Sequence, residues 1–364
     1  MSDKLKKVGG VSVVSDHALA VEILKSDAFS VVNLGDYLSR LQLNSEMNFE
    51  LLIKFVSHSP FFIEGDRHHK LKKIFSAVFG KSNLIRWQAT FENEIESVTK
   101  ELEFSIEVDL INYCFDVVKS LFRPMIGLGK ILPDDFEPRL YRFQKLIEPL
   151  LAIRQLVRLQ DELNYLISCL KNSLDKSSEC APNSLLLYLH SETDSEFSYE
   201  DKLMLLLVAY GAKTPLIQTL GNIFLYILVD NRGKYFNSET FDEEHFIKEL
   251  DEVIYRTASL LYIHRVATRD FKCADFFVKQ GAFVLIEIGS AFVNSSASGC
   301  GFHKSLGFGL GAHYCSGALI SKVIISMVVP LFFKIYPHAT AKTWEYDSSI
   351  QTAKSLKTLK ANTR

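Results

Sequence analysis

Apolar residues recur at helical spacing through most of the chain, and strand-like alternation is confined to short segments. The chain reads as short helices and loops over residues 29–63 and as a polar loop over 172–184. Asp16 precedes a short helix as a candidate N-cap. Residues 276–288 alternate around Lys279-Gln280-Gly281, which predicts a β-hairpin. The spacing predicts the longer helices at residues 66–78, 88–104, 110–128, 133–170 with a break near Pro149, 185–190, 200–229, 241–258 and 318–333.

Composition indicates an ordinary globular protein with a sizeable core. Of 364 residues, 48% are hydrophobic and 23% are charged, and we expect one domain over residues 1–364. The net charge of −2, from 41 basic and 43 acidic residues, argues against a nucleic-acid-binding protein. Lys213, Pro215, Gln218 and Asn222 interrupt the apolar run 203–229, so we interpret it as a buried helix and not a membrane span. Six cysteines without a CxxC pair, and no secretory signal, predict a cytoplasmic protein with free thiols.

The stretch from residue 308 to 317 carries the strongest chemical signal. Its sequence is Phe-Gly-Leu-Gly-Ala-His-Tyr-Cys-Ser-Gly, and an apolar helix follows it. Cys315 therefore lies on a tight loop that opens into a helix, where backbone N–H groups and the helix dipole favour a thiolate. Such a thiolate acts as a nucleophile or as a metal ligand. The alternative is an inert, buried cysteine in a glycine-rich turn.

The spacing Phe-Gly-x-Gly-x-His-x-Cys-x-Gly resembles the haem-binding loop of the cytochrome P450 family. The resemblance implies haem b (iron protoporphyrin IX) as cofactor and Cys315 as the axial iron ligand. It implies a P450-like fold, mainly α with small β-sheets, which is shortened at its N-terminus because the resemblance starts inside the family's first sheet. The remaining cofactor-binding residues that it implies in this loop are Phe308, Gly309, Gly311, His313 and Gly317.

Three further positions match the family's contacts to the haem propionates. Taken alone, residues 66–75 are a basic helix start, with His68 and Lys72 four apart on one face. Beside Cys315, they resemble the helix whose histidine and basic residue hold a propionate. Arg265, in His-Arg-Val-Ala-Thr-Arg-Asp, resembles the arginine that a family strand offers to the same groups. The resemblance assigns His68, Lys72, Arg265 and His313 to the cofactor edge.

The central helix departs from the family pattern. Gly211 and Thr214 match a group that kinks this helix over the iron and passes protons into the site. Lys213 stands where the family has an acid, and Pro215 itself breaks the hydrogen-bond ladder. The resemblance makes Gly211, Lys213 and Thr214 the catalytic candidates, whereas the plainer interpretation is a kink in a buried helix.

The family's Glu-x-x-Arg pair is also altered. Glu252 lies four residues before Arg256, not three, so we expect either a shifted structural ion pair or a surface pair of little energetic weight. No arginine occurs between residues 294 and 308, where the family has a longer meander.

Three functions remain open at this stage. The first is a haem-thiolate monooxygenase that oxidises a small, partly apolar or carrier-bound substrate with electrons from a separate ferredoxin or flavodoxin. The second is a haem-thiolate enzyme that uses no dioxygen, either peroxide-driven or isomerase-like, which Lys213 favours. The third is a non-catalytic P450-like binding module. The substrate is not readable from the sequence.

Overall fold

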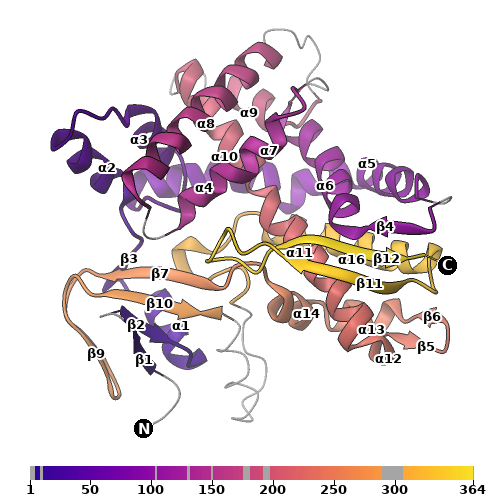
Figure 1. Ribbon diagram of the computed structural model, residues 1–364. Coiled ribbons are helices and arrows are strands. Elements are labelled where there is room, and N and C mark those ends of the chain that lie inside the picture. The colour runs from indigo at the N-terminus through magenta and orange to yellow at the C-terminus, as the bar shows by residue number, and fades with distance from the viewer. Residues whose placement is uncertain are drawn as a thin grey trace.

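The computed structural model describes residues 5–8, 11–102, 105–128, 132–148, 151–174, 181–191, 197–288 and 306–363. Its helices are longer and more numerous than its strands, which confirms the predicted class, mainly α with small β-sheets (Figure 1). The helices are α1 His17–Lys25, α2 Leu34–Leu43, α3 Glu50–Ser57, α4 Gly65–Phe79, α5 Lys81–Lys100, α6 Leu110–Ile126, α7 Phe136–Phe143, η1 Gln144–Ile147, α8 Ile153–Leu174, α9 Leu185–Ser191, α10 Tyr199–Gly211, α11 Lys213–Leu225, η2 Tyr226–Asp230, α12 Arg232–Tyr235, α13 Glu243–Lys248, α14 Leu250–Thr257, η3 Gly311–His313 and α16 Ala318–Ile335.

The strands form one larger sheet and three smaller ones. The five-stranded sheet has the order β1-β2-β10-β7-β3, with β10 parallel to β2 and antiparallel to β7. A three-stranded sheet has the order β11-β12-β4, and β5–β6 and β8–β9 are two-stranded. The strands are β1 Leu5–Val8, β2 Val11–Val14, β3 Phe29–Ser30, β4 Glu107–Asp109, β5 Phe236–Asn237, β6 Thr240–Phe241, β7 Tyr262–Ala267, β8 Phe271–Cys273, β9 Phe276–Val278, β10 Phe283–Glu287, β11 Thr340–Tyr346 and β12 Leu356–Asn362.

The predicted β-hairpin at residues 276–288 is wrong in its pairing. Strand β9 pairs with β8 and lies outside the five-stranded sheet, whereas β10 pairs with β7 and β2. Alternation finds each strand correctly, but two consecutive strands pair with each other only if the turn between them permits it. Here Gly281, at φ +82°, turns the chain away from β9 and back along β7.

Helix boundaries differ from the sequence-based ranges in ways that local chemistry explains. The helix predicted over 241–258 is two helices, α13 and α14, which meet at Glu249. Helix α5 begins at Lys81, seven residues before its predicted start, because polar residues dominate its first two turns. The N-cap of α1 is Asp16, as predicted, and its side chain accepts from the Leu19 N–H at 2.9 Å.

Two hydrophobic clusters stabilise the fold. The larger unites α3 to α11 with α16 and β12, and the smaller packs α1 against the five-stranded sheet. The segments α10–η2 and α16 are long and apolar enough to cross a membrane by length and mean hydropathy, but 78% of the most apolar window of the first is buried inside the protein. Helix α11 lies in the middle of the molecule, beneath α7 and α8 (Figure 1).

Candidate active site

Cys315 lies on the turn between η3 and α16, and two glycines shape that turn. Gly309 and Gly311 have φ values of +70° and +72°, which other residues rarely adopt. A Cβ at Gly311 would lie 2.5 Å from the Leu24 carbonyl oxygen, so α1 is pressed against this loop. The Cys315 N–H donates to the Phe308 carbonyl at 2.9 Å and closes the loop. The backbone therefore fixes where the sulfur lies.

The Cys315 side chain is accessible to solvent, and partial enclosure by the surrounding protein raises the pKa of its thiol. A backbone hydrogen bond from Gly317 and the charge of Lys72 act in the opposite direction and lower the pKa. A stable thiolate here needs a further positive charge, which a bound metal ion supplies.

The four predicted edge residues come together beside this loop. His68 and Lys72 come from α4, Arg265 from β7 and His313 from η3. The His68 and His313 rings are 4.3 Å apart between centroids, and Lys72 Nζ donates to the Tyr314 carbonyl. Burial, reinforced by neighbouring cations, lowers the pKa of His68 and of His313 to about 4 each.

This cluster has the chemistry to hold an anionic edge. His68 Nε2 is buried and has no hydrogen-bond partner within the described part of the chain. Arg265 is 7% exposed, and its guanidinium donates to the His264 carbonyl of its own strand. Glu64 is the acidic residue nearest the cluster, at 3.6 Å from His313 Nε2. Lys72 and Arg265 carry positive charge and the two imidazoles offer N–H donors, so the donor set fits a group that carries carboxylates.

The central helix turns one narrow face toward an opening. Of residues 202–225, four are not buried, namely Val208, Gly211, Ala212 and Pro215. Their spacing of i, i+3, i+4 and i+7 places them on one stripe of the helix. The central helix is therefore accessible along this stripe and buried on its other faces. None of the four side chains can donate or accept a proton.

Thr214 and Lys213 lie on another face of the same helix. Thr214 is 8% exposed and Lys213 1% exposed, and both line a cavity of ≈ 640 Å³ between α6, α7, α11 and β12. The structure thus brings Thr214 and Lys213 together but places Gly211 alone on the exposed stripe.

Lys213 is neutralised by a residue of another helix. Its Nζ lies 2.8 Å from Glu137 Oε2 of α7 and 3.7 Å from the centre of the Tyr210 ring. Glu137 also accepts from the Tyr210 hydroxyl and lies 3.5 Å from the Arg123 guanidinium. Burial lowers the pKa of Lys213 to about 8, although the charge of Glu137 acts to raise it.

Curated relatives support the resemblance found in the sequence. The chain is 24% identical over 355 residues to "Putative cytochrome P450 140" of Mycobacterium tuberculosis, covering 90% of this chain and 78% of the relative. It is 21% identical over 301 residues to "Cytochrome P450(MEG)" of Priestia megaterium, covering 75% of this chain and 70% of the relative. No family model matches the chain.

Solved structures share the whole architecture. P450BioI, solved in complex with hexadec-9Z-enoic acid ligated acyl carrier protein, matches with a TM-score of 0.84 at 14% identity, over 99% of this chain and 94% of that one. CYP109E1 from Bacillus megaterium, solved with testosterone, matches with a TM-score of 0.77 at 14% identity, over 100% and 95%. The chain therefore has the fold of the cytochrome P450 structures and is similar in sequence to curated cytochrome P450s.

The altered Glu–Arg pair is formed on the surface. Arg256 donates to Glu252 Oε1 at 2.9 and 2.7 Å, and the side chains are 38% and 41% exposed. Val253, Ile254 and Tyr255, which lie between the two, are buried. The segment 294–305, where the meander arginine was missing, lies outside the described residues.

Sequence reasoning missed the residues that α7 and η1 contribute. Glu137 and Gln144 contact the central helix from 76 and 67 positions away in the chain. One indication of Glu137 is present in the sequence: the lysine inside an apolar helix, Lys213, requires an acidic partner. Nothing in the sequence identified which acid.

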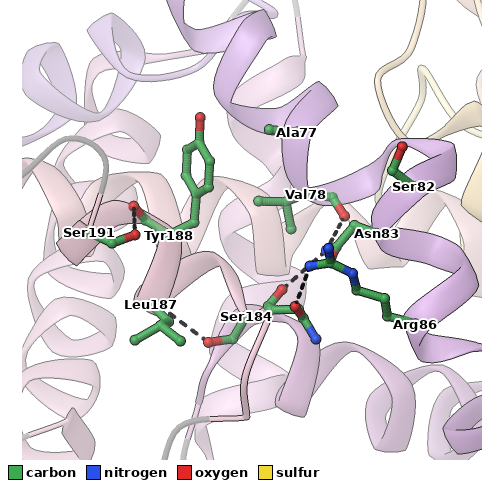
Figure 2. Close-up of a pocket in the computed structure, with 10 residues that line it drawn as sticks. Ala77, Val78, Ser82, Asn83, Arg86, Ser184, Leu187, Tyr188 and Ser191 are labelled. Atoms are coloured by element: carbon green, nitrogen blue, oxygen red, sulfur yellow. Dashed lines mark hydrogen bonds between the residues drawn. The ribbon is translucent and has the colours of Figure 1, made fainter.

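A smaller hollow of ≈ 330 Å³ lies between α4, α5 and α9 (Figure 2). Its polar side chains already bond to protein groups: Asn83 donates to the Val78 and Asn183 carbonyls, and Arg86 to Asn183 Oδ1. It has no residue in common with the thiolate loop or the cationic cluster.

Proposed function

We propose that this protein is a cytochrome P450, a haem-thiolate oxidoreductase that oxidises a small, partly apolar organic substrate. The observation that carries the proposal is the convergence of four cationic or donor groups, two of them buried, beside the loop that carries Cys315. When bound, a haem with a thiolate ligand supplies oxidative chemistry, because the thiolate donates electron density that favours O–O cleavage.

Each residue of the site has a role in this proposal. Cys315 is the iron ligand, and the backbone N–H of Gly317 tunes its charge. Gly309 and Gly311 shape the turn that presents the sulfur, and Phe308 packs beside it. His68, Lys72, Arg265 and His313 hold the two propionates of haem b through charge-assisted hydrogen bonds.

A second candidate is a peroxide-driven enzyme of the same haem-thiolate kind. One specific observation favours it. The accessible stripe of the central helix (Val208, Gly211, Ala212 and Pro215) offers no proton donor, while Thr214 and Lys213 line the cavity between α6, α7, α11 and β12. Activation of dioxygen consumes electrons and protons, whereas a peroxide already carries both. An isomerase-like reaction, which needs neither, stays within this candidate.

The partners follow from the same proposal. The substrate is a small molecule or a carrier-bound one, the latter supported by the likeness to P450BioI solved with an acyl carrier protein. In the first candidate, a separate ferredoxin or flavodoxin supplies electrons, and the protein acts in the cytoplasm. The third interpretation, a non-catalytic module, is disfavoured because a protein without cofactor has no use for a buried cation such as Arg265, or for the buried His68 Nε2 that has no partner among the described residues.

An absorption spectrum of the reduced protein with carbon monoxide tests the proposal. We expect the thiolate-type Soret band, and its loss in Cys315→Ser. Cys273→Ser, a substitution of another free cysteine, is the matched control and keeps the band. A thiolate band that survives in Cys315→Ser contradicts the assignment. Turnover with hydrogen peroxide but not with dioxygen and reduced ferredoxin selects the second candidate.

A further inference from the structure

The break in the central helix leaves one carbonyl without its usual partner. In an α-helix, the N–H of residue i donates to the carbonyl of residue i−4. Pro215 has no N–H, so the Gly211 carbonyl receives no donor from its own helix. A buried carbonyl without a donor is destabilising, and this one lies where α10 ends and α11 begins.

A side chain from the segment above replaces the missing donor. Gln144, the first residue of η1, donates from Nε2 to the Gly211 carbonyl at 3.0 Å. The neighbouring carbonyls are satisfied within the helix, since the Ala212 N–H donates to Val208 and Tyr210. Gln144 thus supplies the hydrogen bond that Pro215 removes.

Two further contacts come from the same face of the segment. Glu137 pairs with Lys213 at 2.8 Å, and Leu140 Cδ1 lies 3.7 Å from where a Cβ of Gly211 would be. Residues 137, 140 and 144 have helical spacing, so one side of α7–η1 rests on the break in the central helix. The α7–η1 segment and the break in the central helix are joined at this point.

We propose that Gln144 is a positioning residue that holds the Gly211–Ala212 wall in place and couples it to α7–η1. The hydrogen bond replaces a backbone donor, so its loss frees the wall and the segment together. The inference rests on the proposed function only in taking the opening beside Ala212 and Pro215 as the cofactor cavity.

A rescue experiment on the full-length protein tests this role by hydrogen exchange of residues 136–148 and 208–219. Gln144→Leu removes the donor at similar size, and we expect exchange to rise about two- to tenfold in both segments, as a typical hydrogen bond predicts. Adding Pro215→Ala restores a backbone N–H for the Gly211 carbonyl. Exchange in 208–219 then returns toward the wild-type rate, while 136–148 stays fast because the contact between the segments is still missing.

Two controls make the outcome decisive. Gln155→Leu removes a glutamine whose side chain accepts locally from the Ala152 N–H, and it leaves 208–219 unchanged. Gln144→Glu has no donor when ionised and regains one when protonated, so its exchange relative to wild type falls as the pH is lowered. Unchanged exchange in Gln144→Leu, or losses that simply add when Pro215→Ala is introduced, overturns the proposal.

The result is separable from the proposed function. The same exchange measurements on Cys315→Ser report the coupling without the thiolate. A missing thiolate band together with intact coupling rejects the haem assignment alone, and the reverse pattern rejects Gln144 alone.

Discussion

The thiolate loop and the break in the central helix are built in different ways. In the loop, the family's pattern is complete, and backbone geometry at Gly309 and Gly311 positions Cys315. At the break, Lys213 and Pro215 depart from the pattern, and side chains from α7–η1 provide the missing interactions. A site held by its own backbone is readable from a short stretch of sequence, whereas a site held by a distant element is not.

The difference extends to charge. The loop region gathers Lys72 and Arg265 with two imidazoles, and burial together with neighbouring cations lowers the pKa of His68 and of His313 to about 4. The break instead pairs its buried lysine, Lys213, with Glu137. The first arrangement has cations and donors that can bind an external anion, whereas the cation of the second is already paired within the protein.

The largest effect is expected at the backbone of the loop. Gly311→Ala places a Cβ 2.5 Å from the Leu24 carbonyl oxygen at a residue with φ +72°. We expect a loss of about 3 kcal/mol or more in the free energy of unfolding, from the left-handed conformation and the overlap together. Chemical denaturation measures it.

Gly309→Ala is the matched control for this substitution. Its φ of +70° is the same, but its Cβ would meet the nearest atom, the His313 carbonyl oxygen, at 3.4 Å. We expect only the conformational cost, about 1–2 kcal/mol. Equal losses in the two variants would show that contact between α1 and the loop does not matter.

The break is tested by the pH dependence of stability. The pKa of Lys213 is about 8 in the folded protein, lowered by burial from 10.5. Between these values the unfolded chain binds the proton and the folded one does not, so the free energy of unfolding rises with pH. The rise amounts to about 3 kcal/mol from pH 8 to 10.5, and it is absent in Lys213→Met.

Lys54 provides a control of opposite sign. Burial lowers its pKa, but the contacts with Glu200 and Asp201 outweigh burial and raise it. Its contribution to stability therefore falls as the pH rises through its folded pKa. In Lys54→Met this decrease in the free energy of unfolding with pH is absent. A Lys213→Met curve parallel to wild type between pH 8 and 10.5 would show that Lys213 is not desolvated.

Much of the fold could be predicted from the sequence, because long apolar periodicities specify helices and a break-free pattern such as 318–333 closely matches α16. The pairing of β9 could not, since the alternation of Phe276–Val278 carries no information about its partner β8. The loop of Cys315 could be recognised from the sequence because positive φ values require glycine at fixed positions. Thr214 matches the family's residue type, but the turn of the helix at Ala212 determines which face Thr214 occupies. A shift of the helix by one residue would change that face without changing the sequence.

The cationic cluster should control cofactor retention more than folding. Arg265→Gln removes a buried cation whose charge-assisted contact is worth about 1.5–3 kcal/mol, so we expect haem binding to weaken about 10- to 150-fold. Haem titration of the purified protein measures the affinity. Arg256→Gln, a substitution of an arginine on the surface, is the control and leaves the affinity unchanged. Equal affinity of Arg265→Gln and wild type would remove Arg265 from the cofactor edge.

The smallest effect is expected at the displaced Glu–Arg pair. Glu252 and Arg256 lie four apart on α14 with the acid first, which favours their contact, but both side chains are more than a third exposed. Solvent screens such a pair, and a double-mutant cycle with Glu252→Gln and Arg256→Gln should give a coupling free energy of about 0.5 kcal/mol or less. Salt should weaken even this value, while haem occupancy stays that of wild type. A coupling above about 1.5 kcal/mol, or loss of haem in Glu252→Gln, would mean that the pair supports the thiolate loop despite its exposure. The Glu252–Arg256 pair would then be, like the break in the central helix, a described region where this chain uses an interaction that departs from the family pattern.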